Sequence, residues 1–191
     1  KKKKKKKRYF YFFFISVKKK TKIAFLDRDG VINSSKVKGG YISQIKDFKW
    51  LNGSKKAIKY LKSKKYKVVI VTNQSGIARG YFSIKDVYRL HRYFKDELLK
   101  YGTTVDKIYI CPYHKDGIIK KYKKISTLRK PSIGMFLKAN KVWKVDRQKS
   151  FMIGDQITDM EFAKRAKIKG YLYNQNNLYK FIKEKILKEI H

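Results

Sequence analysis

The sequence predicts an α/β protein in which a parallel β-sheet carries helices on both faces. Two observations lead to this fold class. Five short apolar runs recur along the 191 residues, and amphipathic helical patterns lie between them. Strands that alternate with helices form parallel sheets, because each crossover helix returns the chain to the same end of the sheet. The length suits one such domain with short extensions, and 42% hydrophobic residues are enough for its core.

The expected strands are short apolar runs with strand character. In chain order they are Ile23–Asp27, Val68–Thr72, Lys107–Cys111, Ser150–Gly154 and Lys169–Tyr173. Gly30 comes soon after the first run and lets the backbone turn there. We expect Asn33 to cap that turn.

The expected helices show apolar residues spaced three and four apart. In chain order they are Gly53–Lys64, Ser83–Tyr101, Ile133–Trp143, Ile157–Ala166 and Leu178–Ile190. The second has the longest pattern, and Ser83 followed by Asp86 is a loose capping box for its N-terminus. The last is basic and amphipathic, and we expect it to pack on the surface of the domain.

Three parts of the chain are expected: a basic and aromatic appendage (residues 1–20), the main domain (21–175) and the C-terminal helix (176–191). The appendage resembles a signal peptide in outline, with a basic run before apolar residues 9–17. That apolar stretch is shorter than the ~20 residues that span a bilayer. A lead-in strand, a membrane-surface anchor and sequence upstream of the true start all remain open for this segment.

The formal net charge of +37 is extreme and would favour a polyanionic partner such as nucleic acid or an anionic membrane. However, 43 lysines stand against eight arginines and are spread along the chain. Nucleic-acid binders use more arginine, so this pattern favours compositional drift in an AT-rich genome. We expect no specific nucleic-acid partner and no membrane span. The single cysteine, Cys111, fits a reducing compartment such as the cytoplasm.

Charged and polar side chains follow the expected strands, at the edge where parallel sheets bind ligands. Asp27 and Asp29 follow the first strand, residues 71–80 overlap and follow the end of the second, and Asp155 and Asp159 follow the fourth. Ionised carboxylates at the rim of a core are costly unless a cation meets them. A partner side chain, a helix N-terminus or a metal are the candidates.

These side chains suit phosphoryl transfer. Four of them are hard oxygen ligands of the kind that Mg²⁺ binds, namely Asp27, Asp29, Asp155 and Asp159. Thr72 can hydrogen-bond phosphoryl oxygens, and Lys130 offers them a point charge. Asp27 can attack phosphorus, while Asp29 protonates the leaving group and then activates water.

The segments "DRDGVIN", "TNQSGIARG", "RKP" and "GDQITD" resemble the four motifs of the haloacid dehalogenase (HAD) superfamily. They resemble most closely the D-glycero-D-manno-heptose 1,7-bisphosphate 7-phosphatases, with histidinol-phosphate phosphatases as close relatives. The resemblance runs from about Lys22 to Tyr173. It implies a Rossmann-like HAD fold with little or no cap, and an Mg²⁺-dependent phosphatase that acts through an aspartyl-phosphate. It also implies a sugar bisphosphate substrate, in ADP-heptose synthesis for the lipopolysaccharide core, and a cytoplasmic enzyme; we expect a monomer.

The resemblance also assigns roles. Asp27 is the nucleophile and Asp29 the general acid/base, and its backbone carbonyl also binds Mg²⁺; Asp155 is the third metal ligand, oriented by Asp159. Thr72 and Lys130 hold the transferring phosphoryl group. The remainder of the substrate is expected to contact Asn73, Arg79 and Arg129.

One departure concerns zinc. Many members of the family carry a C-x-H…C-x-C zinc loop before "RKP", and a structural zinc needs four nitrogen or sulfur ligands. Here Cys111 remains, but Tyr113 occupies the histidine position, and Ser126 and Leu128 occupy the later cysteine positions. Cys111 and His114 cannot complete a site, so no structural zinc is expected. The loop shapes substrate choice in the family, and its divergence leaves the sugar open.

Two other functions stay open. A phosphatase for histidinol phosphate or another sugar phosphate would carry similar motifs. A basic nucleic-acid-binding protein with idle phosphatase motifs would account for the charge, although the intact set of catalytic residues argues against it.

Overall fold

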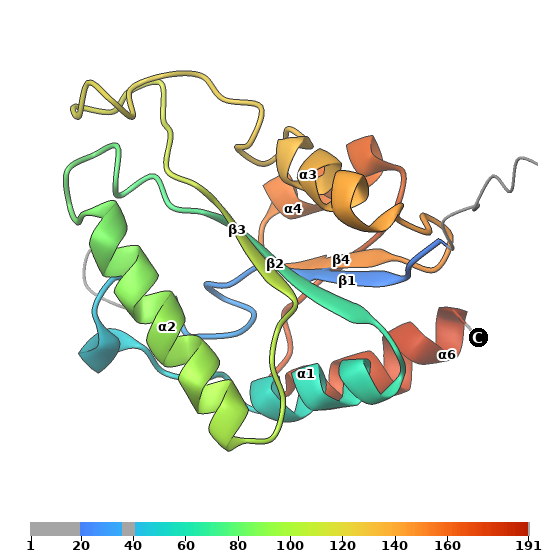
Figure 1. Cartoon of the computed structure of the whole chain (residues 1–191). Coiled ribbons are helices and arrows are strands. Elements are labelled where there is room, and N and C mark those ends of the chain that lie inside the picture. The colour runs from blue at the N-terminus through green and yellow to red at the C-terminus, as the bar shows by residue number, and fades with distance from the viewer. Residues whose placement is uncertain (1–19, 36–40, 191) are drawn as a thin grey trace, which may run out of the picture.

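The computed structural model describes residues 20–35 and 41–190. Its centre is a five-stranded sheet of order β3-β2-β1-β4-β5, in which every neighbouring pair is parallel (Figure 1). The strands are β1 (Ile23–Leu26), β2 (Lys67–Asn73), β3 (Lys107–Cys111), β4 (Phe151–Gly154) and β5 (Lys169–Leu172). Each end lies within one residue of the expected position, so the α/β fold class is confirmed. The expected appendage lies outside the described residues, except for Lys20.

Four main helices flank this sheet: α1 (Ser54–Ser63), α2 (Ile84–Lys100), α3 (Gly134–Trp143) and α4 (Ile157–Ala166). Helices α1 and α2 cover one face, and α3 and α4 cover the other (Figure 1). The expected capping box is confirmed, because the Ser83 side chain accepts from the backbone of Asp86 and the Asp86 side chain accepts from the backbone of Ser83.

The core forms two layers because alternate residues of each buried strand point to opposite faces. In β1, Ala24 and Leu26 join the layer under α1 and α2, whereas Ile23 and Phe25 join the layer under α3 and α4. All four side chains are fully buried. This explains why the strand reads as a continuous apolar run and not as an alternating one.

The C-terminal segment consists of three consecutive helical pieces: α5 (Leu178–Phe181), a π-helical turn η2 (Ile182–Ile186) and α6 (Leu187–Ile190). The expectation of a single α-helix is therefore corrected by one π-helical turn. Its buried side chains, Leu178, Phe181, Ile182, Ile186 and Leu187, belong to the α1 and α2 layer of the core. The apolar stripe thus stays on one side of the segment, whichever way the turns are wound. The division of the chain at residue 175 stays a prediction.

The described parts of the connections form no cap domain over the carboxyl edge of the sheet. Between β1 and α1 the described residues form loops and one 3₁₀ turn, η1 (Ile45–Asp47). Between β3 and α3 they form turns and bends with isolated bridges. Within residues 20–35 and 41–190, no helix has the length and apolar character needed to cross a bilayer.

Candidate active site

A buried lysine joins two of the predicted carboxylates. The ammonium of Lys130 lies 2.9 Å from Oδ1 of Asp27 and 2.6 Å from Oδ1 of Asp159. Burial tends to lower the pKa of Lys130, but the two carboxylates more than offset it and the pKa is raised. Burial raises the pKa of Asp27 to about 7, against the opposing effect of Lys130 and with a further contribution from Asp159. Lys130 is therefore the cation that makes burial of Asp27 tolerable.

Asn73 holds the segment that carries Lys130. At the end of β2, its side-chain Nδ2 donates to the carbonyl of Lys130 (3.2 Å), and its Oδ1 accepts from the N–H of Lys130 (3.1 Å). This reciprocal pair docks a loop 57 residues away in sequence onto the end of the strand. The amide of Asn73 is thus occupied by the protein, and its predicted contact with substrate stays a prediction.

Asp155 follows β4 and completes a group of three carboxylates. Asp27, Asp155 and Asp159 each offer one oxygen, and these oxygens all lie within 4.8 Å of one another. Oδ2 of Asp155 accepts from Nε2 of Gln156 (3.0 Å), whereas Oδ1 is buried and has no donor among the described residues. Burial raises the pKa of Asp155, so its ionised form is under-stabilised. Three carboxylates beside one ammonium leave an excess of negative charge, and this oxygen set fits Mg²⁺.

Gly30 makes room for Asp155. Its φ is +85°, and a Cβ added there would lie 2.1 Å from Oδ2 of Asp155. Only glycine combines this backbone conformation with so close an approach. The turn after the first strand therefore changes the direction of the chain and also leaves space for the carboxylate of Asp155.

Asp159 contacts Lys130 directly and reaches Asp155 through Gln156. Its Oδ2 accepts from the N–H of Gln156 (3.1 Å) in the capping box of α4. The side chain of Gln156 in turn donates to Asp155. The predicted orientation of Asp155 by Asp159 thus has a route through one intervening residue.

Thr72 and Asp29 are joined by Gln74. Its Nε2 lies 2.9 Å from Oγ1 of Thr72 and 2.9 Å from Oδ2 of Asp29. Asn33 is fully buried and donates from Nδ2 to Oδ1 of Asp29 (2.8 Å). Asn33 therefore does more than cap the turn, because its side chain holds a predicted catalytic group.

The sequence analysis did not single out three residues of this region, Arg28, Gln74 and His91, and it missed the contact of Asn33 with Asp29. Arg28 pairs with Asp29 at 2.8 Å and contacts His91 of α2. The sequence held a signal for Arg28 and one for His91. Arg28 stands between two aspartates in a buried segment. His91 lies on the apolar face of α2, four residues after Val87 and three before Phe94.

The predicted substrate residues Arg79 and Arg129 lie near His114. Nη2 of Arg79 is 3.3 Å from Nε2 of His114. Burial lowers the pKa of His114, and the charges of Arg129 and Arg79 lower it further. Nε of Arg79 and Nη1 of Arg129 are buried without an acceptor among the described residues. Both ring nitrogens of His114 face donors, because the N–H of Asp116 points to Nδ1 (3.1 Å) and Nη2 of Arg79 points to Nε2. A neutral imidazole can accept at only one of its two nitrogens.

The residues at the family's zinc positions do not fit a zinc ion. Cys111 is buried, with its Sγ 3.8 Å from the carbonyl of Tyr113. The ring of Tyr113 packs against Tyr122, and the ammonium of Lys124 lies 4.3 Å from its centre. Backbone hydrogen bonds hold this loop, since the N–H groups of residues 118 and 119 both donate to the carbonyl of Ala78. The absence of zinc in the purified protein stays a prediction.

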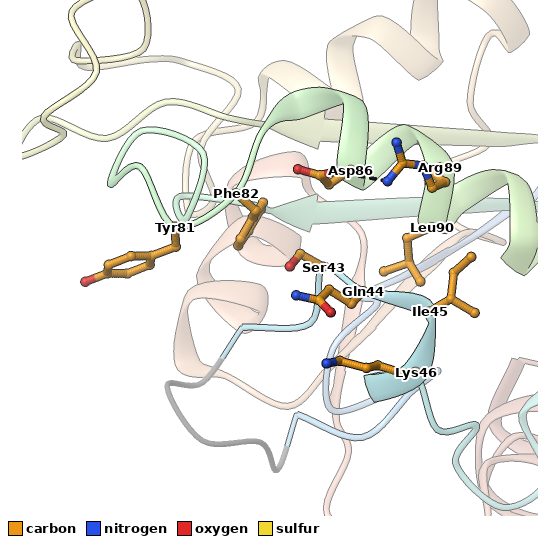
Figure 2. A pocket seen from close by; sticks show the side chains of 9 residues that line it. All are labelled: Ser43, Gln44, Ile45, Lys46, Tyr81, Phe82, Asp86, Arg89 and Leu90. Carbon is orange, nitrogen blue, oxygen red and sulfur yellow. Dashed lines mark hydrogen bonds and ion pairs between the residues drawn. The ribbon is translucent and has the colours of Figure 1, made fainter.

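A separate pocket lies between the segment after Tyr41 and the first turns of α2 (Figure 2). It is lined by Ser43, Gln44, Ile45, Lys46, Tyr81, Phe82, Asp86, Arg89 and Leu90. None of these is a predicted site residue. The residues that line this pocket are thus different from the predicted site residues.

A parallel α/β sheet that brings an aspartate, a buried lysine and two further carboxylates to one edge defines the class of the HAD-type phosphatases. The family model described as "Polynucleotide kinase 3 phosphatase" matches residues 22–181. A D-glycero-beta-D-manno-heptose-1,7-bisphosphate 7-phosphatase of Rhodopseudomonas palustris is 41% identical, over 86% of this chain and 90% of its own length.

Two solved structures are similar over most of this chain. A HAD-like phosphatase of Mesorhizobium loti is 35% identical, with a TM-score of 0.73 over 80% of this chain and 72% of its own. The D,D-heptose 1,7-bisphosphate phosphatase of B. bronchiseptica, complexed with magnesium and phosphate, is 28% identical, with a TM-score of 0.72 over 88% and 87%. The chain belongs to the heptose-bisphosphate phosphatase family of the HAD superfamily, and it is a phosphatase.

Proposed function

We propose that this phosphatase removes the 7-phosphate of D-glycero-D-manno-heptose 1,7-bisphosphate. The single observation that carries the choice of a bisphosphate is the group of donors formed by Arg79, His114 and Arg129. Two guanidinium nitrogens there are buried without acceptors among the described residues, and the two ring nitrogens of His114 face two N–H donors, of which a neutral imidazole can accept only one. Unpaired buried donors are costly, and an anion would satisfy them together. Arg129 adjoins Lys130, so a second phosphate fits beside the reacting one.

Asp27 is the nucleophile of the proposed reaction. Its Oδ1 accepts from the N–H of Arg28 (2.7 Å) and pairs with Lys130. An oxygen of Asp27 attacks phosphorus and forms an aspartyl-phosphate as the bond from phosphorus to the sugar oxygen breaks. Lys130 stabilises the charge that develops on the phosphoryl oxygens, and Thr72 hydrogen-bonds them.

Asp29 is the general acid and base of the proposed reaction. It donates a proton to the departing sugar oxygen and then takes one from the water that attacks the aspartyl-phosphate. That second attack releases inorganic phosphate and regenerates Asp27.

A bound Mg²⁺ would neutralise the phosphoryl oxygens as the carboxylate approaches them. Its proposed protein ligands are Asp27, Asp155 and the backbone carbonyl of Asp29. The orphaned Oδ1 of Asp155 supports this assignment. The roles of all these residues are part of the proposal.

The donor group also discriminates between the alternatives. Histidinol phosphate carries an amino group and no second phosphate, so it would bring a cation to a site already rich in arginine and histidine. A sugar bisphosphate brings the anion that these donors lack.

We also propose a place for this enzyme in lipopolysaccharide-core synthesis, a cytoplasmic location and a monomeric state.

The test compares phosphate release from the heptose bisphosphate, the heptose 7-phosphate and histidinol phosphate. We expect the bisphosphate to have the highest kcat/KM. Arg129→Ala should lower it about 10- to 100-fold for the bisphosphate, and much less for the 7-phosphate, because a charge-assisted contact is lost only where the second phosphate is present. Arg165→Met, on the exposed side of α4, is the control.

Three results would contradict the proposal. A preference for histidinol phosphate would give the protein the alternative substrate. Retained turnover in Asp27→Asn, with its fold intact, would remove Asp27 as the nucleophile. Nucleic-acid binding that falls steeply with salt, without any Mg²⁺-dependent phosphate release, would favour the non-enzymatic alternative.

A further inference from the structure

Arg28 is among the largest fully buried side chains of the protein, at 1% exposure. It stands between Asp27 and Asp29, and every nitrogen of its guanidinium has a partner. Nε and Nη2 donate to Asp29, Nη1 contacts Nε2 of His91, and Nη2 also donates to the carbonyl of Ile42. Burial of an arginine is tolerated only with such complete pairing, so its position is strongly determined.

The carboxylate of Asp29 is held by three side chains. Arg28 approaches it as a fork, with distances of 3.1 Å from Nε to Oδ1 and 2.8 Å from Nη2 to Oδ2. Asn33 and Gln74 donate to the two oxygens from other directions. The planar fork sets both the position and the plane of the carboxylate, which a single point charge would not do.

His91 holds Arg28 from the neighbouring helix. Its Nε2 lies 3.1 Å from Nη1 of Arg28. Arginine has no acceptor, so Nε2 accepts, and the ring is neutral with its proton on Nδ1. Burial lowers the pKa of His91 to about 3, with the charges of Arg28 and Lys95 acting in the same direction, which agrees with a neutral ring.

The backbone contact comes from the segment that also forms the wall of the pocket in Figure 2. Ile42 is buried and directly precedes Ser43, the first residue of that wall. Arg28 therefore links three elements that are distant in sequence: the turn after β1, the segment at residue 42 and helix α2.

We propose that Arg28 and His91 are positioning residues for Asp29: His91 and the Ile42 carbonyl fix Arg28, and Arg28 fixes the Asp29 carboxylate toward the leaving oxygen. This inference rests on the proposed role of Asp29 as the general acid. Neither residue touches the substrate in this scheme. Their effect is geometric, because proton transfer requires the carboxyl group within hydrogen-bond reach of the departing oxygen.

The test uses the dependence on the leaving group. A sugar or glycerol oxygen needs a proton as it departs, whereas 4-nitrophenolate is stable without one. We measure the release of the leaving group in the first turnover, which reports the acid step before the aspartyl-phosphate is hydrolysed. For Arg28→Met we expect a loss of about 100-fold with glycerol phosphate and less than 10-fold with 4-nitrophenyl phosphate.

Two further comparisons keep the test decisive if Arg28→Met folds poorly. Arg28→Lys keeps the charge without the fork and should show the same difference between leaving groups, at a smaller size. His91→Leu removes the acceptor and should lower glycerol release, whereas His91→Gln restores an acceptor and most of the rate. Arg165→Met should match the unmodified protein.

Equal losses for the two leaving groups, or no loss in Arg28→Lys and His91→Leu, would overturn the inference. The proposed substrate is tested separately, because glycerol phosphate and 4-nitrophenyl phosphate are neither of them heptose bisphosphates. If the protein did not hydrolyse the heptose bisphosphate, the proposed substrate would be wrong. The difference between the two leaving groups would still decide the role of Arg28.

Discussion

The ammonium of Lys130 and the Oδ1 of Asp159 lie 2.6 Å apart, and both side chains are almost completely buried. The same ammonium is 2.9 Å from Asp27. One cation thus pairs with Asp27 after β1 and with Asp159 in the first turn of α4, and no cation among the described residues pairs with the third carboxylate, Asp155. This imbalance of charge is the main physical argument for a divalent cation at the site.

Replacement of Lys130 tests this arrangement. Lys130→Ala should abolish most turnover and destabilise the fold by about 3 kcal/mol, because two buried carboxylates lose their cation. Urea unfolding and phosphate release measure the two effects. Mg²⁺ should recover part of the stability in this variant, since it supplies positive charge to the same carboxylates.

The matched control is Lys169→Ala, which breaks an exposed pair with Glu189. It should leave activity and stability unchanged, because exposed ion pairs contribute little. Full activity in Lys130→Ala would show that the phosphoryl group is held elsewhere.

Replacement of Asp155 tests the metal assignment. Asp155→Asn keeps the size of the side chain but removes its charge, so the Mg²⁺ concentration for half-maximal rate should rise by about 10-fold or more. A titration of phosphate release with Mg²⁺ measures this. Glu161→Gln, an exposed change on α4, serves as the control. An unchanged Mg²⁺ requirement in Asp155→Asn would remove Asp155 from the ligand set.

Stability should depend on pH through His91. In the folded protein its pKa is lowered to about 3 from an ordinary 6.5, chiefly by burial. Below pH 6.5 the unfolded chain binds a proton that the folded protein does not, so stability falls with pH until about pH 3. At pH 4.5 the loss in the free energy of unfolding that comes from His91 is about 2.5 kcal/mol.

His91→Gln isolates the effect, because glutamine keeps an acceptor for Arg28 and does not titrate there. Urea unfolding of both proteins at pH 7 and pH 4.5 should show a larger loss with histidine than with glutamine. Equal losses would mean that the ring of His91 takes up its proton without unfolding.

The zinc content provides a chemical check of the loop. Elemental analysis of the purified protein should find no stoichiometric zinc, because Tyr113, Ser126 and Leu128 replace three ligands. A zinc-selective chelator should leave the thermal midpoint unchanged. One zinc per chain would show that ligands other than these positions complete the site.

The local sequence pattern predicts most of the secondary structure of this chain. The strand ends were placed within one residue, because buried parallel strands are uniformly apolar and end at polar residues. The capping box of α2 needed only Ser83 and Asp86. The prediction for the C-terminal segment was less accurate. An α-helix and a segment with one π-helical turn present the same apolar stripe, so the sequence pattern does not distinguish them.

The order of apolar runs by itself determined the α/β class, and the rule for parallel sheets placed Asp27, Thr72 and Asp155 at one edge. The tertiary structure decided which polar groups meet there: Asn73 with Lys130, 57 positions apart, and Arg28 with His91, 63 positions apart. Local periodicity acts over a few residues and so fixes secondary structure, whereas a buried charge selects its partner by distance in space, after the helices and strands have packed.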